Sequence, residues 1–250
     1  IRIVHVDPAN VKGLISDNEF IDNITWVTDV GWTTGYGVAM SVVNIDSWYS
    51  FTYGTENTVY IEDNYFSGHR HCVATQNGGS YVFRYNRVER NTGNASCDMH
   101  GNEPYWDPNY EQFEYSSRYA EIYGNTFIAT PPDDPIYEGG LVAIRPKGGE
   151  LVIWDNIFKD YPDQSITLMI SFHFWNNEAS YYPDGWELTY PLPYQIGYES
   201  GNNYGDSHTG TDPSTYVAGD VFLWDNEYIN SAGLQIGNDP DHPDWLIQED

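Results

Sequence analysis

Two histidines and an aspartate near the two cysteines are the residues of this chain best suited to acid–base or metal chemistry. His71 directly precedes Cys72, Asp98 directly follows Cys97, and His100 lies two residues further on. Two imidazoles and a carboxylate could exchange protons near neutral pH or bind a divalent metal ion. The spacing does not match the two-histidine helical metal motif, so a solvated row of polar side chains is the simpler interpretation. The choice depends on whether the fold brings the three side chains to one face.

Carboxylates near the end of the chain form a second candidate site. Asp239, Asp241 and Asp244 lie within a few residues of one another. They could bind calcium, because hard cations prefer oxygen ligands. The segment lacks the EF-hand pattern, and the prolines between the aspartates restrict its backbone. Calcium is therefore the one cofactor that the sequence suggests, and none is required.

Aromatic residues outside the regular segments form a third candidate site. The chain has 9 Trp, 22 Tyr and 10 Phe, and many of them lie in stretches rich in Gly, Pro, Asn and Asp, which are predicted loops. Flat rings beside Asp and Asn form surfaces that suit sugars and also protein interfaces. The alternative is that the loops fold back and bury their own rings. The predicted ligand-binding rings are Trp106, Trp175, Trp186, Tyr190 and Tyr194.

A recurring phrase indicates the elements that must position these residues. A stretch of alternating apolar and polar residues leads into an asparagine, and an aromatic or branched residue follows two positions later. The phrase occurs six times, at Asn18, Asn64, Asn86, Asn125, Asn156 and Asn226. Alternation with period two and enrichment in Val, Ile, Tyr, Phe and Trp predict β-strands. The clearest interval is 22 residues, from Asn64 to Asn86, which is the length of one turn of a parallel β-helix.

The repeated positions have predicted structural roles. The asparagine can adopt a left-handed backbone at a corner and can hydrogen-bond to asparagines above and below it. Asp17, Asp63, Asp155 and Asp225 precede the asparagine, and a turn role is predicted for them rather than catalysis. The residues two positions after the asparagine should form one interior column, namely Phe20, Phe66, Val88, Phe127, Phe158 and Tyr228.

These phrases resemble the right-handed parallel β-helix repeat proteins of pectin-lyase-like architecture. The resemblance covers about residues 14–236 and is strongest at residues 79–86, 98–101, 121–127 and 154–156. These segments are similar to a secreted prokaryotic subgroup whose activity is mostly undefined. The resemblance implies an all-β fold, a right-handed parallel β-helix or solenoid with long aromatic-rich loop insertions, and one domain over residues 1–250. It implies little about function, because one fold hosts many functions.

The cysteine spacing makes the first candidate site more specific. Cys72 and Cys97 are 25 residues apart, about one turn of the coil, so they could stack and form a disulfide. Two buried thiols are the alternative. If both cysteines point inward, alternation turns His71, Asp98 and His100 outward, and these three side chains are then predicted to share an exposed face.

Composition restricts the setting and the partners. Ten Lys and Arg against 37 Asp and Glu give a formal charge of −27, so nucleic acid and acidic membrane surfaces would be repelled. No apolar stretch is long enough for a membrane-spanning helix. The first residues already alternate like a strand, so the sequence is expected to be a mature product or a segment of a longer surface protein. Few lysines, the resemblance, and two possible glycan acceptors, Asn23 and Asn94, favour an extracellular or cell-surface location.

Three classes of function remain open. The first is an extracellular structural or adhesive module, part of a fibre or array, that contacts glycan, surface proteins or other copies of itself through aromatic loops. The second is a polysaccharide hydrolase or lyase, with Asp98, His100 and His71 as its catalytic candidates. The third is a carbohydrate-binding module without catalysis. The structural role ranks first because a lyase acting on acidic polysaccharide needs a cationic site, and a hydrolase needs two positioned carboxylates, of which only Asp98 is identified.

Overall fold

The structure is a computed structural model that describes residues 4–6, 13–22, 26–30, 58–75, 80–92, 95–99, 103–104, 113–114, 119–136, 142–146, 150–162, 165–169 and 221–237. The regular secondary structure in these ranges consists of β-strands alone, so the predicted all-β class is confirmed. The same ranges contain no helix that is long and apolar enough to cross a membrane.

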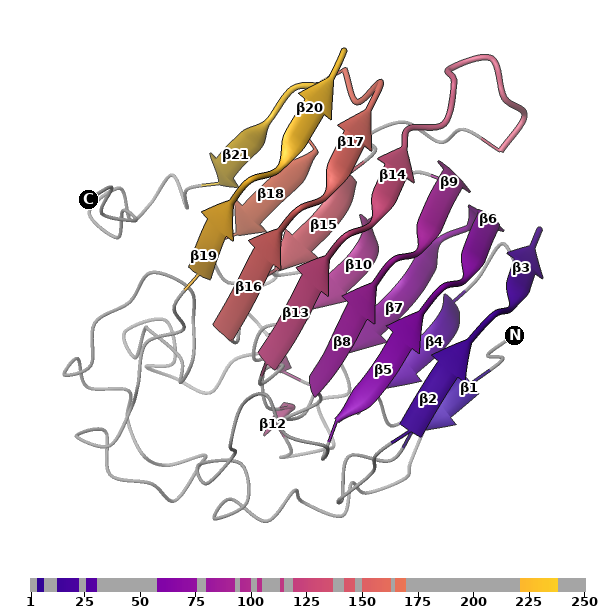
Figure 1. Ribbon diagram of the computed structural model, residues 1–250, viewed down its shortest axis with the longest axis vertical. Helices are drawn as coiled ribbons and strands as arrows, with labels where there is room; N and C mark the ends of the chain where they lie inside the picture. The colour runs from indigo at the N-terminus through magenta and orange to yellow at the C-terminus, as the bar shows by residue number, and fades with distance from the viewer. Residues whose placement is uncertain are drawn as a thin grey trace, which may run out of the picture.

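Three parallel sheets hold almost all the described strands (Figure 1). Sheet I contains β2 (Gly13–Ser16), β5 (Val59–Glu62), β8 (Ser80–Arg84), β13 (Tyr119–Tyr123), β16 (Glu150–Trp154) and β19 (Val221–Trp224). Sheet II contains β3 (Glu19–Ile21), β6 (Tyr65–His69), β9 (Arg87–Asn91), β14 (Thr126–Ile128), β17 (Ile157–Lys159) and β20 (Glu227–Ile229). Sheet III contains β1 (Val4–Val6), β4 (Trp26–Val30), β7 (His71–Thr75), β10 (Ala95–Met99), β15 (Val142–Pro146), β18 (Ile166–Met169) and β21 (Leu234–Gly237). The short strands β11 (Glu103–Pro104) and β12 (Phe113–Glu114) pair antiparallel with each other.

The chain passes through the three sheets in a fixed rotation. After β1 it runs from sheet I to sheet II to sheet III, and then it starts again in sheet I beside its previous strand. Figure 1 shows sheet III behind the other two, with β1, β2 and β3 at one end and β19, β20 and β21 at the other. Equivalent residues of successive passes are therefore neighbours in a parallel sheet, about 4.8 Å apart.

The six repeated asparagines form one continuous hydrogen-bonded ladder between sheets I and II. The backbone N–H and the side-chain Nδ2 of Asn64 both donate to Oδ1 of Asn86, at 3.0 and 3.1 Å. The same pair of bonds joins each asparagine to the next, from Asn18 to Asn226. The predicted equivalence of Asn64 and Asn86 and the predicted bonding between asparagines are confirmed.

The left-handed residue at this corner is not the asparagine but the residue before it. Asp17, Asp63, Asp155 and Asp225 have φ between 49° and 58°, and the remaining two passes place Tyr85 (φ 57°) and Gly124 (φ 65°) there. The turn role predicted for the aspartates is correct, whereas the left-handed backbone predicted for the asparagine is wrong. The left-handed residue turns the chain so that the asparagine directly after it in sequence points its amide inward, where Nδ2 reaches backbone carbonyl groups.

A column of mostly aromatic side chains fills the interior beside sheet II, as predicted, except that its last member, Tyr228, is 38% exposed. Phe20 pairs with Phe66, Phe66 with Val88, Val88 with Phe127, Phe127 with Phe158, and Phe158 with Tyr228. Phe127 and Phe158 are parallel, with ring centroids 5.3 Å apart. Stacked rings of this kind contribute about 0.5–1.5 kcal/mol per pair beyond the burial of their area.

Burial distinguishes sheet III from the other two. Residues alternate between buried and partly exposed in β5 and β16 of sheet I, so this sheet has one face toward the core and one toward solvent. In sheet III, every residue of β7 and β10 is buried. Both faces of these two strands are therefore shielded from solvent.

We predict that a central asparagine of the ladder contributes far more to the unfolding free energy than the first asparagine does. Asn86→Ala removes the acceptor of two Asn64 donors and the donors to the Ile61 and Arg84 carbonyl groups, all in a buried corner. Each buried group without a partner costs about 1–3 kcal/mol, so the expected loss of unfolding free energy is about 2–4 kcal/mol. The matched control is Asn18→Ala, where the side chain is exposed and the loss should stay below about 1 kcal/mol. Urea unfolding measures both values, and equal losses would contradict the ladder's structural role.

Candidate functional site

The predicted acid–base cluster is a buried ion pair, not an exposed face. Asp98 and His71 are each 1% exposed, so the prediction that they lie on the surface is wrong. Every residue of β7 and β10 is buried, so neither face of these strands meets solvent, whichever side a residue takes. His100 lies outside the described residues.

Asp98 is held by Arg145 on the neighbouring strand. The two residues are directly opposite each other in β10 and β15, and the guanidinium contacts both carboxylate oxygens at 3.2 Å. Such a two-point contact fixes the carboxylate geometrically as well as by charge. The carboxylate is buried and the guanidinium is largely buried. Because burying a single charge is costly, each of the two is stable there only in the presence of the other.

His71 completes the group. Its Nδ1 lies 2.6 Å from the carbonyl oxygen of Ala95, so Nδ1 carries the proton and donates it. Its Nε2 lies 3.8 Å from Oδ2 of Asp98 and therefore faces the carboxylate. The structure thus brings together His71 and Asp98 and adds Arg145, which the sequence analysis did not identify.

The two cysteines are free thiols, contrary to the predicted disulfide. Cys97 lies opposite Val73 rather than Cys72, so the predicted register is wrong by one residue. Both side chains are fully buried, and burial raises the pKa of each thiol well above its ordinary value. The alternative interpretation, two buried thiols, describes the structure.

A second buried histidine, His69, ends β6 two residues before His71. His69 Nε2 is 3.3 Å from the hydroxyl of Ser96, which also accepts a bond from Asn91 Nδ2. The other ring nitrogen of His69 is buried and has no hydrogen-bond partner. Burial lowers the pKa of His69 from 6.5 to about 3, so the imidazole is neutral at physiological pH.

The outward face of sheet I carries aromatic side chains across adjacent strands. We call Tyr60, Tyr85, Tyr123, Trp154, Phe222 and Trp224 the aromatic strip. Tyr85, Phe222 and Trp224 are 53%, 57% and 44% exposed, and the other three are partly exposed. Since neighbouring strands are about 4.8 Å apart, the strip extends for roughly 20 Å across β5 to β19.

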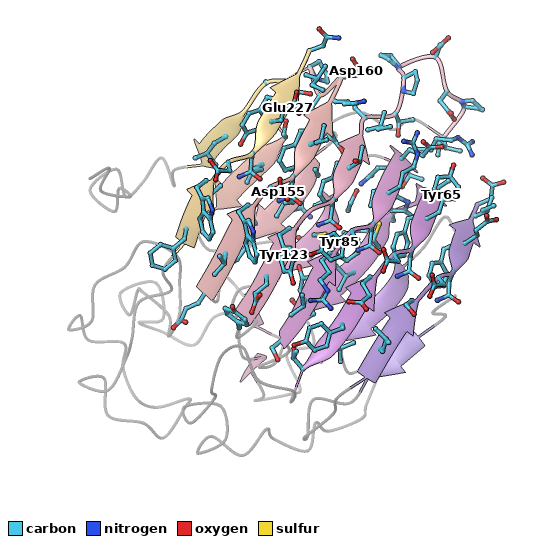
Figure 2. The ribbon with its side chains drawn as sticks, viewed as in Figure 1. Tyr65, Tyr85, Tyr123, Asp155, Asp160 and Glu227 are labelled. Carbon is cyan, nitrogen blue, oxygen red and sulfur yellow. The ribbon has the colours of Figure 1, made fainter. Side chains whose placement is uncertain are left out.

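The rings of the strip are ordered by mutual contact. Tyr123 and Trp154 stack with centroids 3.9 Å apart, and Trp154 stacks on Trp224 at 5.2 Å. Tyr85 meets Tyr123 edge to face at 5.6 Å, and Figure 2 shows both tyrosines near the middle of sheet I. Gly124 makes room for this ring, because a Cβ there would lie 2.6 Å from Tyr85 Cδ1. The stacked rings Tyr123 and Trp154 therefore shield each other, while Tyr85, Phe222 and Trp224 are the most exposed rings of the strip.

Arg84 provides the charged group of the strip. Its guanidinium forms an ion pair with Glu62, donates to the Tyr123 hydroxyl at 2.8 Å, and lies over the Tyr60 ring at 5.0 Å. Such a cation over an aromatic face adds about 0.5–1 kcal/mol at an exposed site. The strip combines apolar rings with hydroxyl, indole N–H and guanidinium donors. Two carboxylates accompany its cation: Glu62 pairs with Arg84, and Glu121 lies in the row of equivalent residues between Tyr60 and Phe222.

A cleft lies beside the loop that follows β14, where β9, β14 and β17 of sheet II end. It encloses about 580 Å³, and Ile128, Ala129, Thr130 and three prolines, Pro131, Pro132 and Pro162, line much of its wall. Its charged side chains are Glu89, Arg90, Asp134 and Asp160, the last of which is labelled in Figure 2.

One carboxylate of the cleft, Asp134, is held by an arginine. Arg90 donates to Asp134 at 3.0 Å and to Asp22 at 2.9 Å. The bond from Arg90, with a further one from the Ile136 backbone, lowers the pKa of Asp134. A general acid in glycoside hydrolysis needs a raised pKa, so Asp134 does not meet this requirement.

Most of the other predicted site residues lie outside the described residues. These are the rings Trp106, Trp175, Trp186, Tyr190 and Tyr194, the calcium candidates Asp239, Asp241 and Asp244, and the glycan acceptors Asn23 and Asn94. Within the described residues, no three His, Cys, Asp or Glu side chains gather as metal ligands.

Sequence reasoning missed the aromatic strip, although a signal was present. Tyr123, Trp154 and Trp224 each stand two positions before a repeated asparagine, on the outward side of the strand. An aromatic residue that recurs at an outward position predicts a surface ladder, just as one at an inward position predicts a core column.

No protein-family model, curated protein or solved structure matches this chain.

We predict that Asp98 and Arg145 stabilise the fold only as a pair. Asp98→Asn should lower the unfolding free energy by about 3 kcal/mol, because it leaves the largely buried guanidinium without its counter-charge. The double variant Asp98→Leu with Arg145→Met should recover most of that loss, since apolar replacement of both partners is often neutral. Urea unfolding of both variants and of Arg145→Met alone measures the coupling. Additive losses would show that the two charges act independently.

We predict that His69 makes the protein less stable in acid. Its folded pKa, about 3, lies below the unfolded value near 6.5, so the unfolded state binds the proton more readily. The stability is therefore complete above pH 6.5 and falls as the pH drops toward 3, by at most about 5 kcal/mol from this residue. His69→Gln keeps a donor toward Ser96 but does not titrate. The difference in urea unfolding free energy between the two proteins should change with pH across this range, and a constant difference would contradict the prediction.

Proposed function

We propose that the three sheets form a right-handed parallel β-helix. The fixed rotation of the chain through sheets I, II and III and the parallel pairing of each strand with its equivalent support this fold. About 98% of the crossover connections between parallel strands of one sheet are right-handed, which supports a right-handed coil for this chain. The resemblance to pectin-lyase-like repeat proteins points in the same direction.

We further propose that the chain is a structural or adhesive module of an extracellular or cell-surface protein, and that it contacts a glycan through the aromatic strip. The observation that carries this proposal is the line of exposed rings on adjacent, register-locked strands of sheet I. Exposed aromatic residues gathered on one face indicate a contact surface, since soluble proteins rarely expose such patches without a use. The ladder beneath keeps the rings at fixed spacing, so an extended polymer could meet several of them at once.

Charge indicates which kind of glycan the strip suits. The chain carries a formal charge of −27, which repels uronate-bearing polymers, and Glu62 offsets the one cation of the strip. A neutral polysaccharide avoids this repulsion. Its apolar ring faces can pack on Tyr85 and Trp224, and its hydroxyls can bond with the tyrosine hydroxyls, the indole N–H groups and Arg84.

The buried position of Asp98 favours binding over catalysis. An acid, base or nucleophile must come within hydrogen-bond reach of the substrate, and Asp98 is 1% exposed and engaged with Arg145. The hydrolase or lyase therefore remains the second candidate function, and the same experiment can test it.

The test is binding of the protein to a neutral β-glucan and a mannan, with polygalacturonate as the acidic comparison. Tyr85→Ala and Trp224→Ala should each weaken binding to a neutral polymer about tenfold, or 1.4 kcal/mol. Leu14→Ala, an exposed apolar residue on the same sheet but outside the strip, is the control and should change nothing. Binding unaffected by both ring variants would refute the role of the strip. New reducing ends or unsaturated products that Asp98→Asn abolishes would instead establish the enzyme.

A further inference from the structure

The cleft beside β14 lies where the repeated turn from sheet II to sheet III is interrupted. The passes before and after β14 make this turn at left-handed residues, Arg90 (φ 54°) and Asp160 (φ 61°). The strand pairing places Ala129 at the equivalent position of the pass between them, and Ala129 is not left-handed. The chain instead continues into a proline-rich loop, residues 130–136. The backbones of Arg90 and Asp160 therefore stand on either side of the cleft, two strand spacings or about 10 Å apart.

Hydrogen bonds fix the proline-rich loop against the sheet. The hydroxyl of Thr130 donates to the carbonyl oxygen of Asn91 at 2.6 Å, where the loop begins. The backbone N–H of Asp134 donates to the Pro131 carbonyl oxygen at 3.0 Å, and its carboxylate accepts from Arg90 at 3.0 Å. The prolines further restrict the backbone. The cleft is therefore formed before a ligand arrives, which lowers the entropic cost of binding one.

The wall of the cleft offers a ligand apolar contacts. Ile128, Ala129 and three prolines supply carbon atoms, and a proline has no backbone N–H to donate. The hydroxyl of Thr130 already donates to Asn91. The volume of about 580 Å³ falls within the range of small-molecule sites, about 300–1,000 Å³. The wall therefore suits a small ligand with an apolar body.

The charged side chains of the cleft favour a cation. Three carboxylates, Glu89, Asp134 and Asp160, stand against one guanidinium, that of Arg90. The charged residues bonded or adjacent to the lining are two acids and two bases, so the excess of negative charge remains; they are Asp22, Asp133, Arg87 and Lys159. The chain as a whole carries a formal charge of −27, which raises the local concentration of small cations and repels anions.

Asp160 is the carboxylate of the cleft with the most capacity left for a ligand. Both oxygens of Glu89 and both oxygens of Asp134 already accept hydrogen bonds. Asp160 is exposed, and within the described residues it accepts one long bond, from Asn230 Nδ2 at 3.4 Å. A carboxylate has about four acceptor sites, so Asp160 can accept further donors. Figure 2 labels Asp160 at the end of β17.

We propose that the cleft binds a small organic amine, which has a protonated ammonium group on an apolar body. The ammonium group donates to Asp160, where the excess of negative charge also attracts it. The apolar body packs against Ile128 and the prolines of the wall. A neutral ligand of the same shape gains only the second of these contributions. The cleft shares no residue with the aromatic strip, so this binding is separate from the proposed contact with a glycan.

Titration calorimetry of the whole chain with benzylamine at neutral pH tests the site. Benzyl alcohol lacks the charge and methylamine lacks the apolar body, so each should bind at least about tenfold more weakly. Asp160→Asn should weaken benzylamine binding about tenfold and leave benzyl alcohol unaffected. The matched control is Asp155→Asn, which removes the same charge from another exposed, left-handed residue of the same pass, outside the cleft, and should change nothing. Both variants should fold, because asparagine tolerates the left-handed backbone.

Three other outcomes would overturn the proposal. The first is a titration in which benzylamine does not bind. The second is equal binding of benzylamine and benzyl alcohol, which would make the cleft an apolar site without selection for charge. The third is an equal loss in Asp160→Asn and Asp155→Asn, which would show diffuse attraction by the acidic chain. Tyr85→Ala should leave benzylamine binding unchanged and Asp160→Asn should leave glycan binding unchanged, so failure of one proposal is distinguishable from failure of the other.

Discussion

The asparagine ladder is the constraint on which the rest of the structure depends. Each asparagine uses its amide to bond the next asparagine and the carbonyl groups of two strands, so each pass of the chain must turn from sheet I to sheet II at the same height. The bonds are buried, where a missing partner costs about 1–3 kcal/mol, and a shift of one residue would break several at once. The register of both sheets follows from this corner.

Fixed register converts a sequence repeat into rows of neighbouring side chains on both faces of a sheet. Because alternation sends successive residues to opposite faces, one pass contributes both to the interior column through Phe127 and to the aromatic strip through Tyr123. The two rows form by the same stacking of equivalent residues, but one is buried and stabilises the fold, whereas the other remains available for contact. Fold and proposed function are thus two outcomes of a single repeat.

The sequence predicted those parts of the structure that depend only on the repeat. The interior column, the bonding between asparagines and the turn role of Asp63 all follow from local spacing. The cysteine register did not, because the path from sheet II to sheet III is longer between β9 and β10: Asn91 lies 22 residues after its partner His69, but Cys97 lies 24 after Val73. The burial of Asp98 was also not predictable, since what shields the outward face of a strand depends on distant segments.

In two rows of equivalent residues, the sequence separates like charges, which helps the acidic composition to coexist with this regularity. Stacking equivalent residues would otherwise place carboxylates 4.8 Å apart in every pass. In the row that contains Glu62, the next residue is Arg84, and the neighbours beyond are aromatic. In the row that begins with Glu19, only uncharged residues and Arg87 intervene before Glu227. Within these two rows no carboxylate therefore stands beside another. At the corner, by contrast, Asp17 stands beside Asp63 and Asp155 beside Asp225, and these side chains are exposed, so solvent screens the repulsion at the position where the left-handed turn favours Asp.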